Sequence, residues 1–236
     1  TRLGNCLNNT GITFSAGANK YWNLAGNNNW SAGWATSSGG SPSINNFPLA
    51  QDTCYIQSTS PASGSTITLD GSYNLGTVDM SGRTSNTLTL ATGTTTPIIY
   101  GNWVNGTGVS FTGTGSITFS GRSSQTLTSA GRTFTQGITL DSLSGTLTLQ
   151  DAFTTNVSST TALSVAQGTF NANNYNVTLS GSASGVSSTG TSTRTIALGS
   201  GAWTIAGTTG WNVVSTGLTI TGTTTISLTS ASAKTF

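Results

Sequence analysis

The chain has 236 residues and very little charge: 7 Lys and Arg, 5 Asp, no Glu and no His, for a formal net charge of +2. The side chains that usually transfer protons or bind metal ions are therefore scarce, which argues against an enzyme and against a metal or other cofactor. The few basic residues form no cluster that would indicate binding to nucleic acid. No apolar stretch approaches the roughly 18 residues of a membrane-spanning helix, so we expect no insertion into a membrane.

Ser and Thr make up about a third of the chain and alternate with apolar residues in short runs. Clear cases are SITFS at 116–120, TLTLQ at 146–150 and NVTLS at 176–180. Alternation with a period of two is typical of β-strands that bury one face. The sequence therefore predicts an ordered, all-β chain, and its many β-branched and aromatic residues argue against disorder.

Residues 1–55 are predicted to form a Trp-, Asn- and Gly-rich N-terminal cap or attachment module. This segment contains three of the six tryptophans, Trp22, Trp30 and Trp34, and a loop-rich stretch at 27–48. The indoles could stack inside a compact cap or form an exposed carbohydrate-binding patch. We favour the compact cap because large aromatic side chains are usually buried.

The two cysteines, Cys6 and Cys54, also lie in this segment. Two thiols without His fall short of the four ligands of a structural metal site, so no metal site is predicted. Either a disulfide between Cys6 and Cys54 or two separate thiols is compatible with the sequence.

Residues 56–236 are predicted to form a repetitive array of β-strands. Pairs of apolar residues recur mostly 8 to 11 residues apart, with turn residues between them. The pairs are Ile67/Leu69, Val78/Met80, Leu88/Leu90, Ile98/Tyr100, Val109/Phe111, Ile117/Phe119, Ile138/Leu140, Leu147/Leu149, Leu163/Val165, Val177/Leu179, Ile196/Leu198, Leu218/Ile220 and Ile226/Leu228. This spacing fits a β-sandwich, a barrel or a β-solenoid.

We favour an elongated parallel β-solenoid, with tandem β-sandwiches as the alternative, because similar strand units continue without long connections. A longer repeat of about a hundred residues is also suggested, since residues 109–121 resemble residues 218–230. Gly and Asn would form the corners, and rows of Ser, Thr and Asn would link the coils. The chain ends within a strand-like pattern, so we expect the array to continue beyond residue 236.

Catalysis has few candidate residues. Without His, neither a Ser-His-Asp nor a Cys-His arrangement can form. Glycoside cleavage requires two carboxylates about 5 to 10 Å apart, and the candidates are Asp52, Asp70, Asp79, Asp141 and Asp151. We expect Asp70, Asp141 and Asp151 to cap backbone amides at turns and Asp79 to pair with Arg83. No catalytic residue is predicted.

Residues 1–53, which include GITF, YWNLAGNNNWS and GWATSSGG, resemble a module that recurs in structural proteins of tailed bacteriophages. GTVDMSGRTSNTLTL at 76–90 resembles the same proteins, which are often labelled tail fibre, head fibre or virion structural protein. The resemblance implies an extracellular, β-structured appendage on the virion surface. It also implies other virion proteins as partners and a homo-oligomer, with a trimer favoured by analogy.

The leading hypothesis is therefore a non-enzymatic structural component of a bacteriophage virion. It would be a fibre or appendage segment that projects from the particle and adheres to the host surface, with glycans as the expected ligand. The candidate binding residues, if they are exposed, are Trp22, Trp30, Trp34, Trp103, Trp203 and Trp211. Trp103 and Trp203 fit core positions equally well. The alternatives are a secreted or surface β-helical adhesin of bacteria, a polysaccharide depolymerase, and a purely architectural role.

Overall fold

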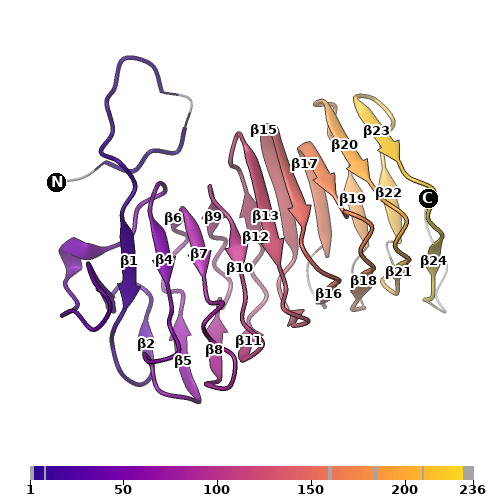
Figure 1. Cartoon of the computed structure of the whole chain (residues 1–236). Helices are drawn as coiled ribbons and strands as arrows, with labels where there is room; N and C mark the ends of the chain where they lie inside the picture. Colours follow the sequence, from indigo (N-terminus) through magenta and orange to yellow (C-terminus); the bar gives the residue numbers. More distant parts are fainter. Residues whose placement is uncertain (1–2, 8, 159–160, 183–184, 209, 231–236) are drawn as a thin grey trace.

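The computed structural model describes residues 3–7, 9–158, 161–182, 185–208 and 210–230. The chain forms a parallel β-solenoid of about 7 turns, whose coils follow one another along a single axis (Figure 1). In the described residues, the only helix is a 3-10 turn, η1 (Ile44–Asn46), and no helix has the length and apolar character needed to cross a membrane. The predicted solenoid is confirmed, and tandem sandwiches are excluded because nearly every strand pair is parallel.

The strands form three sheets along the solenoid, and sheets 2 and 3 begin two coils before sheet 1. Sheet 1 contains β6 (Asn74–Leu75), β9 (Ile98–Ile99), β12 (Ile117–Phe119), the first parts of β15 (Ile138–Leu149) and β17 (Leu163–Asn171), β19 (Val186–Ser188) and β22 (Trp211–Val213). Sheet 2 contains β1 (Asn19–Trp22), β4 (Thr53–Tyr55), β7 (Thr77–Asp79), β10 (Trp103–Val104), β13 (Ser124–Thr128), the second parts of β15 and β17, β20 (Arg194–Ala197) and β23 (Leu218–Thr221).

Sheet 3 consists of two separate ladders. The first contains β2 (Asn28–Asn29), β5 (Ser65–Thr68), β8 (Leu88–Ala91) and β11 (Val109–Thr112). The second contains β14 (Thr133–Phe134), β16 (Phe153–Asn156), β18 (Val177–Ser180), β21 (Trp203–Ile205) and β24 (Ile226–Leu228). The small strand β3 (Trp34–Ala35) lies outside this scheme, because it pairs antiparallel with β1.

The repeating unit is one coil. Thr53 pairs with Thr77, Leu127 with Leu149, and Asn171 with Ala197, so these coils advance by 24, 22 and 26 residues. The longer repeat suggested by residues 109–121 and 218–230 is wrong, because β11 lies in sheet 3 whereas β23 lies in sheet 2. Strands on different sheets have similar sequences because each buries one face and ends at a tight corner.

Alternate residues of each strand point into a continuous core. One inward row of sheet 2 runs through Cys54, Val78, Trp103, Leu127 and Leu149, which pair in successive coils and are all buried. Burial of such a row provides most of the driving force for stacking the coils.

Most of the predicted apolar pairs in these strands are buried, but three are not. Ile98 and Tyr100 are only partly buried, whereas Pro97 and Ile99 point inward. The run PIIY at 97–100 contains no Ser, Thr or Asn that would show which set faces the core. In the last described coil, Leu218, Ile226 and Leu228 are only partly buried and Ile220 is 44% exposed, because β23 and β24 are paired on one side, with β20 and β21.

The N-terminal tryptophans are packed together in the interior. Trp22, Trp30 and Trp34 are each 1% exposed; the ring centroids of Trp22 and Trp34 are 5.5 Å apart, and those of Trp30 and Trp34 are 4.7 Å apart. The predicted packing of these indoles in the interior is confirmed, and the exposed patch is wrong. The boundary at residue 55 stays a prediction based on composition; β1 and β4 continue directly into sheet 2 through β7.

Polar side chains connect neighbouring coils at the corners, as predicted. The Oδ1 atoms of Asn102 and Asn176 accept hydrogen bonds from the backbone N–H groups of Thr126 and Ala202 in the next coil, both at 2.9 Å. Two arginines are also buried, Arg83 at 0% and Arg194 at 1% exposure. Because their guanidinium groups donate mainly to backbone carbonyls of several coils, they stabilise corners rather than form ion pairs.

Candidate functional site

None of the candidate tryptophans forms an exposed platform. Trp103 and Trp203 are buried, which confirms their interpretation as core residues. Their indole N–H groups donate to Asn105 Oδ1 at 2.8 Å and to the carbonyl of Leu198 at 3.1 Å. Trp211 is partly buried and packs edge-on against Trp203, with 6.1 Å between ring centroids. Adhesion through exposed indoles is therefore not supported.

Cys6 and Cys54 are both free thiols, so there is no disulfide. Cys54 lies on β4 and is fully buried; burial raises the pKa of its thiol well above the ordinary value, and the negative charge of Asp52 adds to this effect. Cys6 is partly buried and forms a hydrogen bond with Tyr100. Within the described residues, no three Cys or Asp side chains come together as a possible metal-ligand set.

The five aspartates occupy separate environments. Asp52 accepts hydrogen bonds from the backbone N–H groups of Ala18 and Leu49, both at 2.9 Å. Asp151 accepts from the N–H groups of Ser129 and Ala130 at 2.7 and 2.6 Å, which confirms its predicted capping role.

Asp70 also caps a backbone amide, because its carboxylate accepts hydrogen bonds from the N–H and Oγ–H of Ser31 at 3.2 and 2.6 Å. Asp141 differs from the prediction, because it lies within β15 and accepts a hydrogen bond from Gln167 Nε2 at 2.7 Å.

The predicted pair of Asp79 and Arg83 is wrong. Asp79 Oδ1 accepts hydrogen bonds from the backbone N–H and the hydroxyl of Ser81, at 2.9 and 2.6 Å. Arg83 instead donates to the carbonyl oxygens of Gln57 and Pro61 at 2.9 and 2.7 Å. Asp79 lies on the outer face of β7, whereas the corner that contains Arg83 turns into the interior.

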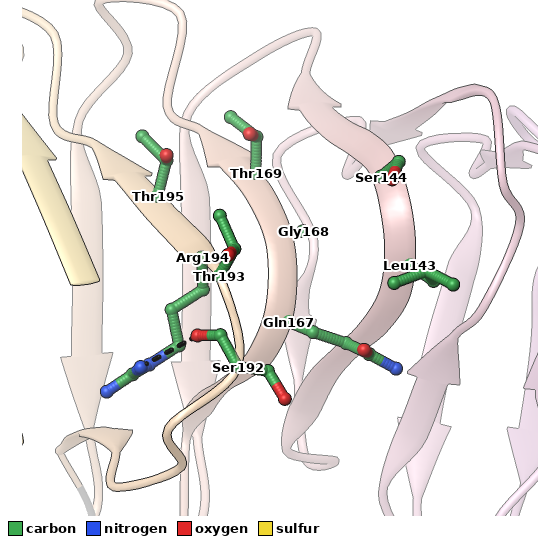
Figure 2. Close-up of a pocket in the computed structure, with 9 residues that line it drawn as sticks. All are labelled: Leu143, Ser144, Gln167, Gly168, Thr169, Ser192, Thr193, Arg194 and Thr195. Atoms are coloured by element: carbon green, nitrogen blue, oxygen red, sulfur yellow. Dashed lines mark hydrogen bonds between the residues drawn. The ribbon is translucent and has the colours of Figure 1, made fainter. Parts of the chain in front are cut away.

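A hollow lies on the corner between sheets 1 and 2. We call it the corner groove; it has a volume of about 480 Å³ and crosses three successive coils (Figure 2). Its lining consists of Leu143, Ser144, Gln167, Gly168, Thr169, Ser192, Thr193, Arg194 and Thr195. The groove forms where β15 and β17 bend from one sheet to the other, and the register of their pairing shifts between Leu140 and Thr146.

The corner groove presents almost no charge. The guanidinium of Arg194 donates to Ser188 Oγ at 2.5 Å and to the carbonyls of Val214, Thr216 and Ser192 at 2.6, 2.7 and 3.0 Å, so its charge is held within the protein (Figure 2). The ligand-accessible groups are therefore hydroxyls, backbone amides and the side-chain amide of Gln167.

Leu143 adds an apolar contact, because its side chain is 48% exposed at one end of the groove. Gln167 donates to Asp141 and retains its Oε1 as an acceptor. Hydroxyls, an amide and one apolar side chain suit a neutral ligand that carries many hydroxyl groups, and no residue of the groove can act as a general acid or base.

Two smaller hollows lie nearer the N-terminus. One, of about 390 Å³, is lined by the segment before β1 and by Gln51. The other, of about 280 Å³, lies beside β4 and β7 and is lined by Tyr55, Ile56, Gln57, Ser58, Asp79, Ser81 and Gly82. None of the three hollows contains two aspartates, so none has the carboxylate pair that glycoside cleavage requires.

The fold and the site define the class of the chain as a parallel β-solenoid with an uncharged corner groove. No model of a known protein family matches the chain, and neither a curated protein nor a solved structure was found to match it.

Proposed function

We propose that the chain is a non-enzymatic structural component of a bacteriophage virion. In this proposal it is a segment of a fibre or related appendage that projects from the particle and adheres to neutral glycans on the host surface. The virion assignment rests on the resemblance of residues 1–53 and 76–90 to phage structural proteins. The solenoid is consistent with it, because stacked coils produce a stiff body that is longer than it is wide.

The observation that carries the adhesive role is the composition of the corner groove. Its accessible groups are hydroxyls, amides and Leu143, and the guanidinium of Arg194 points away from them. A neutral sugar chain would exchange hydrogen bonds with water for similar bonds in the groove, without the cost of removing a charge from water. Equivalent corners of consecutive coils recur at the strand spacing of about 4.8 Å, which suits an extended, repetitive ligand.

Binding of the purified chain to immobilised neutral polysaccharides tests the adhesive role. The substitution Leu143→Asp places a charge in the groove, so we expect it to weaken binding by about tenfold or more. Ile44→Asp is the matched control, because Ile44 is 82% exposed on η1 and lies outside the groove. Equal binding by both variants and the unchanged chain would show that the ligand does not use the groove.

Electron cryo-microscopy of the particle that carries the chain tests the virion assignment. Symmetry-related copies that project from a tail or capsid would support it, and three copies at each position would support the expected trimer. If the chain were found on secreted rods or on a bacterial surface and absent from virions, the proposal would be replaced by a bacterial β-helical adhesin.

A further inference from the structure

We infer that the hollow between β4 and β7 is a second binding site, which accepts a single neutral sugar ring. We call it the tyrosine hollow, after Tyr55. It lies on sheet 2 in the N-terminal coils, whereas the corner groove lies at β15, β17 and β20. The inference goes beyond the proposed adhesive role of that groove and depends on different residues.

The aromatic wall of the hollow is one ring of a stacked pair. Tyr21 and Tyr55 are directly paired on β1 and β4; their ring centroids are 5.3 Å apart and their planes differ by 17°. On the other side of β4, Tyr55 is paired with Asp79 of β7. Because β4 lies between β1 and β7, one face of the Tyr55 ring is covered by Tyr21 and the opposite face is directed toward Asp79 and the hollow.

The polar groups of the hollow provide one acceptor and one donor. Asp79 uses Oδ1 to accept from Ser81, and within the described residues Oδ2 has no partner. Gln57 uses Oε1 to accept from Ser38 Oγ at 2.5 Å, which leaves its Nε2–H groups available. A carboxylate oxygen and an amide N–H that line the same hollow can bind two hydroxyls of one ring, and the carboxylate provides the stronger bond.

The charge behind the hollow favours a neutral ligand over a cation. Arg83 donates from Nη1 to the carbonyl oxygens of Gln57 and Ser58, at 2.9 and 3.4 Å, and both of these residues line the hollow. The buried guanidinium therefore offsets the negative potential of Asp79. A volume of about 280 Å³ lies just below the range of about 300 to 1,000 Å³ for drug-sized ligands, which suits one ring rather than a chain.

These features match the two surfaces of a pyranose. Its C–H groups form an apolar face that can pack on the free face of Tyr55, since the face of an aromatic ring is negative and attracts weakly positive hydrogens. Its hydroxyls lie at the edge, where Asp79 and Gln57 can reach them.

Titration of the full chain with glucose, galactose, mannose and N-acetylglucosamine, followed by saturation-transfer NMR, tests the inference. We expect at least one sugar to bind at millimolar concentration. Tyr55→Ala should weaken its binding by about tenfold or more, and Asp79→Asn by a similar factor. Tyr55→Phe should retain the affinity within about twofold, because it preserves the ring face that contacts the sugar.

Two controls separate the possible outcomes. Tyr21→Ala removes the same tyrosine stack without removing a lining residue, so a comparable loss of affinity in Tyr21→Ala and Tyr55→Ala would indicate a structural effect and overturn the inference. Leu143→Asp alters only the corner groove and should leave the sugar bound. If Leu143→Asp abolishes binding and Tyr55→Ala does not, the tyrosine hollow is excluded while the proposed adhesive groove stands. Absence of binding by all four sugars would also overturn the inference. So would binding of choline in their place, because choline is a cation and the hollow is inferred to accept a neutral ligand.

Discussion

The indole of Trp103 donates from Nε1 to Oδ1 of Asn105 at 2.8 Å, and both side chains lie in the interior. Asn105 in turn donates from Nδ2 to the carbonyl of Ser129 in the next coil, at 3.1 Å. One amide thus satisfies a buried tryptophan and connects two coils.

Replacement of this amide should therefore be costly. We expect Asn105→Leu to lower the free energy of unfolding by about 2 to 3 kcal/mol, because the indole N–H and the Ser129 carbonyl lose their partner in an environment without water. Urea unfolding followed by tryptophan fluorescence measures the change. Asn212→Leu, at an exposed position of β22, is the control and should alter stability by less than about 0.5 kcal/mol.

The buried Arg194 leads to a second prediction. Its planar guanidinium reaches oxygens of Ser188, Ser192, Val214 and Thr216, and a lysine ammonium cannot match this geometry. We expect Arg194→Lys to destabilise the chain by about 2 to 4 kcal/mol, since a charge would remain buried with fewer hydrogen bonds. Thermal unfolding checks this, and Arg122→Lys at an exposed position should leave the melting temperature unchanged. Equal melting temperatures for the two variants would contradict the structural role of Arg194.

The corner at Gly168 leads to a third prediction. Gly168 and Gly131 both have positive φ, +89° and +69°, but only Gly168 is crowded. A Cβ at Gly168 would lie 2.8 Å from the carbonyl oxygen of Gly145 and closer still to that of Ser142, whereas a Cβ at Gly131 meets nothing within 4 Å.

Both alanine variants share the backbone strain of about 1 to 2 kcal/mol. Gly168→Ala should cost about 1 to 3 kcal/mol more, because the neighbouring coil must move. Chemical denaturation of the two variants gives this difference directly. Similar losses in both would show that the corner can relax around a methyl group.

The pH dependence of stability should be flat near neutrality, because the chain has neither His nor Glu. At acid pH, burial raises the pKa of Asp70, but hydrogen bonds from Ser31 and Tyr73 outweigh this effect and lower the pKa from its ordinary value. The stability that Asp70 provides is therefore present above its unfolded pKa and is lost as the pH falls below about 4.

At alkaline pH the stability changes in the opposite direction, because a group with a raised pKa loses its contribution as the pH rises. Burial, a hydrogen bond with Cys6 and nearby negative charge raise the pKa of Tyr100 to about 12. Its contribution is complete below its unfolded pKa of about 10 and is lost between about pH 10 and pH 12. Urea unfolding at a series of pH values should show a plateau and then this loss, and Tyr100→Phe should reduce the alkaline loss. An unchanged alkaline loss of stability in Tyr100→Phe would contradict the role of Tyr100. Tyr175→Phe, at an exposed tyrosine, is the control and should leave the loss unchanged.

The solenoid could be predicted from the sequence because its signal is local. Alternation within a run such as TLTLQ depends only on which face of one strand is buried, and Leu147 and Leu149 are both buried as expected. The burial of Trp22, Trp30 and Trp34 could be predicted for a similar reason, because large aromatic side chains are usually buried. The pattern fails at Ile98 and Tyr100, where every residue of the strand is large and apolar.

The tyrosine hollow and the corner groove could not be predicted from the sequence, because both depend on the register between coils. Tyr55 meets Asp79 only because one coil advances by 24 residues, and the coil length varies along the chain. The corner groove likewise requires Leu143, Gln167 and Ser192 to lie on equivalent corners of three coils. The prediction that Asp79 pairs with Arg83 was wrong, because proximity in sequence does not determine which residue points outward at a corner.

The interruption in sheet 3 has a mechanical consequence. Sheets 1 and 2 run through the middle of the solenoid as hydrogen-bonded ladders, but on the third side the ladder stops at β11 and resumes at β14. Backbone hydrogen bonds between coils run along the long axis, so bending the rod stretches those on one side and compresses those on the other. At the β11 to β14 step side chains replace this ladder: Arg132 Nε donates to the carbonyl of Val109 at 2.8 Å, Gln136 Nε2 donates to that of Thr112 at 3.1 Å, and the rings of Phe111 and Phe134 stack with centroids 4.4 Å apart. Bending the rod at this step therefore strains a few side-chain contacts on the third side rather than a continuous backbone ladder.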